Sequence, residues 1–177
     1  MTREELREAV VRHAYLEGDF VLRSGRRSRY YLDKYRFETH PLLLRELGER
    51  LAARALNADG ERPDLLAGPE LGAVALAAAA SLASGTPFLI VRKDAKTYGT
   101  ERRIEGVFEP GQRVCLVEDV VTTGGAAVAA VAALREAGLE CRRAVCVVDR
   151  EEGGADALAR QAVRLHPLFR ASEIATR

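Results

Sequence analysis

Short apolar runs alternate along most of the chain with longer segments that have helical spacing. The apolar runs have the length of buried strands, and glycine-containing turns separate them from the helical segments. This alternation predicts an α/β fold with a mostly parallel sheet and helices on both of its faces. The predicted strands are 64–67, 87–92, 113–117 and 142–148, and the predicted helices between them are 72–83 and 125–137.

The first 60 residues follow a different pattern. Thr2 and Glu5 have the spacing of a capping box at the start of a helix. Two short strands, 19–23 and 29–35, are then predicted around the turn Ser-Gly-Arg-Arg-Ser. A second helix follows, with Thr39 as its expected cap. We therefore expect a strand pair between two helices ahead of the main sheet.

Length and composition fit one domain over residues 1–177. The formal net charge is +1, which indicates no nucleic-acid or membrane partner. The N-terminus does not resemble a signal peptide, and the longest apolar run, near 74–80, is too short to span a bilayer. Cys115, Cys141 and Cys146 lie in apolar contexts without metal-ligand spacing. Buried reduced thiols in a cytoplasmic protein are the simplest explanation.

Residues 93–107 interrupt the alternation of strands and helices. This segment is polar and charged, and it is bracketed by Gly99 and Gly106. It holds Lys93 and Lys96, two of the three lysines of the chain. A long charged connection inside a compact domain is typical of a mobile functional loop, and a solvated hairpin is the alternative.

The segment with the most chemistry directly follows the predicted strand 113–117. Two carboxylates, Glu118 and Asp119, precede the turn Thr-Thr-Gly-Gly and an alanine-rich helix. Such a turn and helix start can surround a phosphate with backbone N–H groups. The carboxylates can accept hydrogen bonds from ribose hydroxyls or lie near a divalent cation. The pattern indicates a site for a phosphorylated sugar. An ordinary buried turn is the alternative, although adjacent buried acids are costly unless paired or liganded.

Three other polar motifs follow predicted strands. Ligands bind beyond the carboxyl ends of the strands in open parallel sheets. A shared position at those ends therefore predicts that the motifs contribute to one site. They are Gly68-Pro69-Glu70-Leu71-Gly72, Arg92-Lys93 and Asp149-Arg150.

Residues 114–126 closely resemble the phosphoribosyl pyrophosphate (PRPP) signature of the type I phosphoribosyltransferases. The resemblance implies that family's α/β fold, in which helices flank a central, mostly parallel sheet. It also implies a small N-terminal hood at about 18–37 and a flexible catalytic loop at about 93–107. In the family the acidic pair holds the ribose hydroxyls and the Thr-Thr-Gly-Gly turn holds the 5′-phosphate.

From about residue 18 to 153 the chain resembles the orotate phosphoribosyltransferase family in particular. The hood of that family carries a basic residue and aromatic residues that contact orotate. The pair Asp149-Arg150 resembles an Asp-Arg pair whose arginine faces the orotate carboxylate. The orotate-binding residues that the resemblance implies are Arg23, Tyr30, Tyr31, Thr122 and Arg150.

The segment 92–100 resembles the family's catalytic loop, whose basic residues reach the pyrophosphate. The catalytic residues that this implies are Lys96, Lys93, Arg92 and Asp119. The PRPP-binding residues implied are Glu118, Asp119, Val120, Val121, Thr122, Thr123, Gly124, Gly125, Ala126, Arg92, Lys93, Lys96 and Tyr98.

Three positions depart from the family's pattern. Arg23 stands where many relatives have lysine, which keeps the charge and permits bidentate binding of a carboxylate. Tyr98 stands where many relatives have histidine, so histidine acid–base chemistry is excluded there. Leu71 stands where some members have lysine, so we expect that turn to offer only backbone N–H groups to the pyrophosphate.

The reaction implied is transfer of the phosphoribosyl group from PRPP to orotate in pyrimidine synthesis. It gives orotidine 5′-monophosphate and pyrophosphate through an oxocarbenium-like state, which needs cations on the leaving group and exclusion of water. The implied cofactor is Mg²⁺, held through PRPP and water and by no direct protein ligand. The family also implies a homodimer that shares the loop between subunits.

Two other functions stay open. A phosphoribosyltransferase for a purine or for uracil would share the PRPP site, but Arg23 and Arg150 favour a carboxylated base. A PRPP-binding transcriptional regulator would need a nucleic-acid surface. The first 60 residues show no helix-turn-helix followed by a wing, and the charge is balanced.

Overall fold

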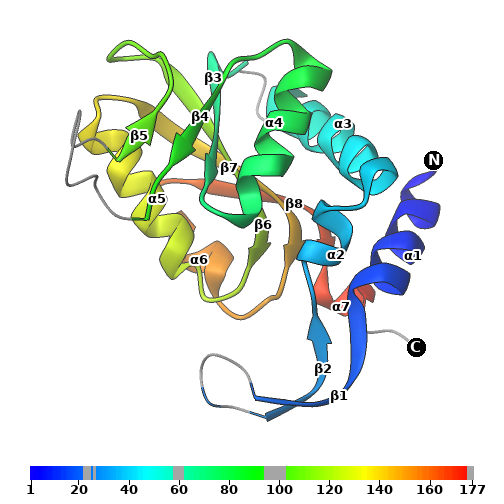
Figure 1. Cartoon of the computed structure of the whole chain (residues 1–177). Helices are drawn as coiled ribbons and strands as arrows, with labels where there is room; N and C mark the ends of the chain where they lie inside the picture. Colours follow the sequence, from blue (N-terminus) through cyan, green and yellow to red (C-terminus); the bar gives the residue numbers. More distant parts are fainter. Residues whose placement is uncertain (22–24, 26, 58–61, 94–102, 175–177) are drawn as a thin grey trace.

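The structure is a computed structural model that describes residues 1–21, 25, 27–57, 62–93 and 103–174. Its centre is a six-stranded sheet with the order β5-β4-β3-β6-β7-β8 (Figure 1). Neighbouring strands are parallel except for β4 and β5, which confirms the predicted mostly parallel sheet. The strands are β3 (Leu65–Pro69), β4 (Phe88–Val91), β5 (Ile104–Glu105), β6 (Arg113–Val121), β7 (Glu140–Asp149) and β8 (Arg164–Arg170).

Helices cover both faces of this sheet (Figure 1). Val114 and Leu116 of β6 join one buried core, whereas Cys115 and Val117 join the other. The reason is that successive side chains of a strand point to opposite faces. The molecule therefore has three layers. One face carries α1 (Arg3–Ala14), α3 (Pro41–Asn57) and α4 (Gly72–Ser84), and the other carries α5 (Gly125–Glu136) and α6 (Gly154–Ala159).

A second, two-stranded sheet stands apart from the main one. Its strands β1 (Tyr15–Val21) and β2 (Arg27–Leu32) pair antiparallel, and they extend away from the six-stranded sheet in Figure 1. The short helix α2 (Tyr35–Glu38) connects this hairpin to α3 and buries Phe37 in the core. The hairpin occupies the predicted hood segment.

Strand β6 is longer than predicted. It ends at Val121 rather than at residue 117, because its pairing with β7 continues as far as Val121 opposite Asp149. Glu118 and Asp119 therefore lie inside the strand and not after it. The apolar run stops before them, so hydrophobicity alone does not indicate the last four residues of the strand.

The start of the chain agrees in part with prediction. The capping box is confirmed, since Glu5 N donates to Thr2 Oγ1 at 3.1 Å and Thr2 N donates to Glu5 Oε2 at 2.7 Å. The first hood strand begins at Tyr15 instead of residue 19, because Tyr15 already pairs with β2. Thr39 does not cap α3: its hydroxyl donates to Tyr35 O at 2.6 Å, at the end of α2.

Several elements near the sheet edges were not predicted. Strand β8 holds Pro167 and a mixed polar sequence, which an edge strand tolerates because one side of its backbone needs no partner. Strand β5 falls within the predicted loop 93–107, so the loop prediction extends too far. Residues 94–102 of that loop lie outside the described residues. The helices α6 and α7 (Ala171–Ile174) were also missed.

The three cysteines are buried and free, as predicted. Burial raises the pKa of Cys141 to about 11, which keeps this side chain a thiol at neutral pH. Within the described ranges, no helix combines the length and the apolar character that a membrane span requires.

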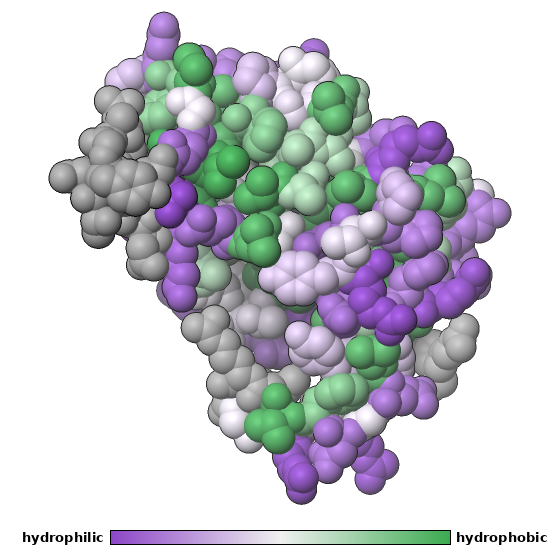
Figure 2. All heavy atoms as spheres, in the orientation of Figure 1, coloured by the Kyte–Doolittle hydropathy of each residue, from purple (hydrophilic) through white to green (hydrophobic). Residues whose placement is uncertain are grey.

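The surface of the molecule is uneven in character. Figure 2 shows apolar residues gathered over α4 and β4, whereas polar residues predominate over α1. Leu71 and Leu82, at the two ends of α4, are 74% and 89% exposed. They are eleven residues apart, which is about three helical turns, so they lie on the same side of the helix.

Candidate active site

The predicted polar motifs lie at one end of the main sheet, where the parallel strands terminate. The carboxyl ends of the parallel strands β3, β4, β6 and β7 meet there. Glu70 N donates to Val91 O at 2.9 Å, and Lys93 N donates to Glu70 Oε1 at 2.6 Å. Arg150 N donates to Val121 O at 2.8 Å. Backbone hydrogen bonds therefore fix the segments after β3, β4 and β7 relative to the sheet.

Asp119 lies at the centre of the residues gathered at this end of the sheet. It is only 4% exposed, and both of its oxygens are bonded. The Lys34 ammonium lies 2.5 Å from Oδ2, and Val120 N donates to Oδ1 at 2.5 Å. A Cβ at Gly72 would lie 1.9 Å from Asp119 Oδ2 and 2.8 Å from Lys34 Nζ. Glycine at the start of α4 is therefore required for this ion pair to fit.

Two more carboxyl groups, Glu118 and Glu38, surround Asp119. Burial, followed by the negative charge of Asp119, raises the pKa of Glu118 to about 8. The same two causes raise the pKa of Glu38 to about 8. Both carboxyl groups are therefore mostly protonated at neutral pH. Their Oε1 atoms are buried, and no described residue forms a hydrogen bond to either.

The turn between β6 and α5 is shaped to receive an anion. Gly124 has a φ of 84°, and α5 begins after it without a side-chain cap. Thr122 and Thr123 are exposed beside it. The N–H groups of the first helical turn are thus available to a phosphate. Gly154 packs underneath, since a Cβ there would meet Thr122 O at 2.5 Å.

An aromatic and arginine group lies between the hood and the end of β7. Arg150 Nη2 donates to Tyr30 OH at 3.2 Å, and its guanidinium lies 5.1 Å from the centre of the Tyr30 ring. Tyr15 stacks on Tyr30 at 5.3 Å between ring centres. The carboxylate of Glu152 lies 3.1 Å from Arg150 Nη2. The structure therefore brings together two of the predicted orotate-binding residues, Tyr30 and Arg150.

The other predicted orotate-binding residues are placed differently. Tyr31 points to the opposite side of β2, as alternation along a strand requires. It is 42% exposed and its ring lies 5.6 Å from that of Phe20. Thr122 is exposed in the turn after β6. Arg23 lies outside the described residues.

The basic residues of the predicted loop are described only at its start. Arg92 is half-buried and Lys93 is exposed directly after β4. Arg103 Nη2 donates to Lys93 O at 3.3 Å and joins the two ends of the loop. Lys96 and Tyr98 lie outside the described residues.

Direct metal ligands are not apparent. Among the described residues, no group of three or more His, Cys, Asp or Glu side chains could hold a metal ion. The carboxyl oxygens of Glu118 and Asp119 are nevertheless the donor type that suits a hard cation bound through water or a phosphate.

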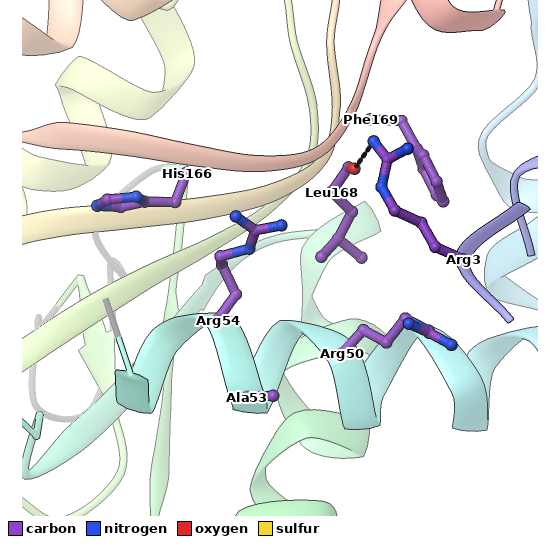
Figure 3. A pocket seen from close by; sticks show the side chains of 7 residues that line it. All are labelled: Arg3, Arg50, Ala53, Arg54, His166, Leu168 and Phe169. Atoms are coloured by element: carbon purple, nitrogen blue, oxygen red, sulfur yellow. Dashed lines mark hydrogen bonds between the residues drawn. The ribbon is translucent and has the colours of Figure 1, made fainter. Parts of the chain in front are cut away.

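One cavity lies away from this end of the sheet. It has a volume of about 460 Å³ and lies between α1, α3 and β8 (Figure 3). Arg3 Nη2 donates in it to Leu168 O at 3.0 Å and forms an ion pair with Glu173 at 2.5 Å. It shares no residue with the strand-end group, by which we mean the side chains described above around the carboxyl ends of β3, β4, β6 and β7: Lys34, Glu38, Glu70, Arg92, Lys93, Glu118, Asp119 and Arg150. The lining residues are Arg3, Arg50, Ala53, Arg54, His166, Leu168 and Phe169.

Sequence reasoning missed several residues of the site. Lys34 and Glu38 were assigned no role, although Lys34 is one of only three lysines in an arginine-rich chain. The contact between Lys34 and Asp119 spans 85 positions, so no local pattern signals it. Tyr15 and Gly154 were missed for the same reason. Each reaches the site through an element, β1 or α6, whose position the sequence does not fix.

Known proteins match both the sequence and the structure. The family described as "Phosphoribosyl transferase domain" matches residues 36–160. The orotate phosphoribosyltransferase of Methanocella arvoryzae is 51% identical over 157 residues, which are 89% of this chain and 87% of that protein.

Solved structures agree with the sequence match. The Mycobacterium tuberculosis orotate phosphoribosyltransferase in complex with PRPP has a TM-score of 0.80 and 35% identity, and the match covers 97% of this chain and 98% of that one. The orotate phosphoribosyltransferase from Aeropyrum pernix has a TM-score of 0.82 and 33% identity, covering 98% and 96%. The chain therefore belongs to the phosphoribosyltransferase family and, within it, to the orotate phosphoribosyltransferases.

Proposed function

We propose that the strand-end group transfers the phosphoribosyl group of PRPP to orotate, which gives orotidine 5′-monophosphate and pyrophosphate for UMP synthesis. The observation that carries this function is the juxtaposition of two parts. One is the acidic pair with its uncapped glycine turn on β6 and α5. The other is Arg150 beside Tyr30, at the end of the neighbouring strand β7.

PRPP binds along the β6–α5 connection. The turn from Thr122 to Ala126 receives the 5′-phosphate, because its glycines and helix start supply backbone N–H donors. Glu118 and Asp119 lie at the ribose, where the Asp119 carboxylate accepts hydrogen bonds from hydroxyls and the protonated Glu118 accepts through its carbonyl oxygen. Val120 and Val121 line this path through their backbone. Charge that develops on the ribose during transfer then faces carboxyl groups in a buried, water-poor position.

Orotate binds between the hood and Arg150. A guanidinium pairs well with a carboxylate, and the flat Tyr30 ring beside it offers a stacking surface for the base. Arg23 of the hood and Thr122 of the turn complete the predicted contacts with orotate, whereas Tyr31, on the other side of β2 beside Phe20, is left out of them. A base without a carboxylate leaves the Arg150 charge with less compensation, which favours orotate over uracil or a purine.

Basic side chains bind the pyrophosphate as it leaves. Arg92 and Lys93 follow β4 at the same end of the sheet, and Lys96 and Tyr98 belong to the segment that continues from them. Cations on the pyrophosphate stabilise the charge that gathers as the C1′–oxygen bond breaks. A loop that covers the site also excludes water from the oxocarbenium-like sugar. The turn at Leu71 contributes backbone N–H groups only.

The cofactor of the reaction is Mg²⁺, which arrives with PRPP. The ion supplies charge stabilisation on the pyrophosphate. Glu118 and Asp119 would hold it through water, since carboxyl oxygens are the donors that a hard cation takes. Chelation by EDTA should abolish turnover, and added Mg²⁺ should restore it. Activity that survives exhaustive chelation would contradict this role.

The active form is a homodimer in the cytoplasm. The exposed Leu71 and Leu82 of α4, together with the apolar residues gathered over α4 and β4 in Figure 2, support a protein interface there, since contiguous exposed apolar surface marks contacts. Free buried cysteines are compatible with a reducing compartment. Sedimentation at micromolar concentration tests the dimer.

The decisive experiment follows the absorbance of orotate. Loss of orotate that needs both PRPP and Mg²⁺, with release of pyrophosphate, is the expected result. Uracil, hypoxanthine and adenine serve as competing acceptor bases in the same assay. Faster turnover of any of these would overturn the assignment of orotate. Gel-shift titration with duplex DNA tests the regulator alternative, for which we expect no complex.

A further inference from the structure

We infer that Lys34 is a positioning residue for PRPP: its ammonium holds the Asp119 carboxylate against the first turn of α4, in the orientation that receives the ribose. This inference rests on the proposed function of the strand-end group. It adds a residue from the hood side of the molecule to a site otherwise built from strand ends.

The geometry of the pair is tight. Lys34 Nζ lies 2.5 Å from Asp119 Oδ2, and the Asp119 side chain is 6% exposed while that of Lys34 is 33% exposed. Gly72 leaves no space for a Cβ on the other side. The carboxylate is therefore clamped between the ammonium and the α4 backbone, and it cannot turn without losing the ion pair.

The bonds to Lys34 and Val120 still leave Asp119 able to bind a ligand. A carboxylate offers about four lone-pair directions. Lys34 uses one on Oδ2, Val120 N uses one on Oδ1, and the Glu38 carboxyl group also forms a hydrogen bond with Asp119. About one direction remains, which is enough to accept a hydrogen bond from a ribose hydroxyl. Lys34 therefore orients the Asp119 carboxylate and still leaves it able to accept a hydrogen bond from the ribose.

Lys34 also stabilises the negative charge of Asp119. Asp119 shares its surroundings with Glu38 and Glu118, whose pKa values are raised by burial and by the Asp119 charge. Burial alone would lower the pKa of Lys34, but the charge and hydrogen bond of Asp119, together with Glu38 and Tyr35, offset this and raise it. Lys34 is thus the cation that stabilises a negative charge in an acid-rich, buried place.

The test is a double-mutant cycle read by PRPP binding. Lys34→Met removes the ammonium and nearly keeps the length of the side chain. In the wild-type background we expect the dissociation constant for Mg²⁺–PRPP, measured by calorimetry, to rise about tenfold or more. The KM for orotate should change less than about twofold. In an Asp119→Asn background, Lys34→Met should change PRPP affinity by less than about twofold, because its partner is already lost.

The control is Arg36→Met, which removes a positive charge from α2, two residues after Lys34. Arg36 is exposed, and no residue in the described part of the chain forms an ion pair with it. The PRPP affinity of the Arg36→Met variant should match that of the wild type. Thermal unfolding of every variant checks the fold. If Lys34→Met does not fold, Lys34→Gln replaces it, and the same fold-changes decide.

Three results would overturn the inference. Equal loss of PRPP affinity in both backgrounds would mean that Lys34 contacts PRPP itself. Tighter PRPP binding by Lys34→Met would mean that Lys34 competes with the sugar for Asp119. Unchanged binding would mean that the pair is only structural. Failure of the proposed function would look different, because the wild-type protein would then not consume orotate with PRPP, whatever Lys34 does.

Discussion

Arg150 is the residue that we propose selects the base. Its side chain is only 12% exposed and contacts Tyr30 and Glu152. We predict that Arg150→Ala raises the KM for orotate strongly and leaves PRPP affinity near the wild-type value. Loss of a charge-assisted pair costs about 2–5 kcal/mol. Steady-state kinetics with each substrate varied in turn measure the effect.

A matched control for Arg150 lies on the same strand. Arg142 of β7 is 76% exposed and pairs only at the surface with Glu140, where an ion pair contributes little. Arg142→Ala should therefore retain normal kinetics. A parallel loss of affinity for orotate and PRPP in Arg150→Ala would disprove its assignment to the base.

Glu118 makes stability depend on pH. Its pKa is raised from 4.5 to about 8 in the folded protein, so the folded state binds more protons than the unfolded state between these values. Its contribution to stability is complete below about pH 4.5 and is lost as the pH rises through about 8. We predict that the free energy of unfolding of Glu118→Gln falls less than that of the wild type as the pH rises. Urea unfolding at pH 6 and pH 9 measures the difference, and an equal drop in both proteins would contradict the prediction.

At the scale of elements, the packing of α6 beneath the β6–α5 turn bears on the phosphate site that we propose there. A Cβ at Gly154 would lie 2.4 Å from Val121 Cγ1 and 2.5 Å from Thr122 O. We predict that Gly154→Ala costs about 1–3 kcal/mol of stability through overpacking and weakens PRPP binding, because the turn is displaced. Thermal melts and calorimetry provide the measurements.

The control substitution adds one atom to α6 at a position that is open to solvent. Ala155, the next residue of α6, is exposed, so Ala155→Ser should leave both the melting temperature and PRPP affinity unchanged. Normal PRPP binding by a folded Gly154→Ala protein would show that the turn does not depend on α6.

The elements that sequence predicted best are those with a continuous local signal. The apolar run that starts β6 and the glycine turn after it indicated the strand, the turn and the helix start that the structure shows. Strand β8 was missed because Pro167 and polar residues hide an edge strand. The last four residues of β6 were missed because Glu118 and Asp119 end the apolar run, although pairing with β7 continues. Lys34 could not be found, since its role comes from a contact across the fold.

At the scale of the whole molecule, the prediction concerns subunit exchange. In the resembled family the loop closes over the neighbouring subunit, and a two-fold interface makes such exchange reciprocal. Lys96→Ala and Asp119→Asn should each be nearly inactive as pure dimers. After mixing in equal amounts, half of the dimers should be hybrids with one intact site each. Activity should recover to about a quarter of the wild-type value if pairing is random.

Native mass measurement must accompany that experiment to count the hybrids. Hybrids without recovered activity would mean that Lys96 serves its own subunit or that the two sites do not work independently. The single mutants, each reassociated with itself, are the controls and should stay inactive.

The separation of the two sheets has an evolutionary consequence. The hairpin of β1 and β2 carries Tyr30 on one continuous stretch of chain, whereas the proposed sugar and phosphate site belongs to β6 and α5. A new acceptor base can therefore arise by replacement of the hairpin together with a change at Arg150, while the PRPP machinery is inherited intact. Lys34 sets the limit of that exchange: a transplanted hairpin must end before it, because Lys34 is bound to Asp119.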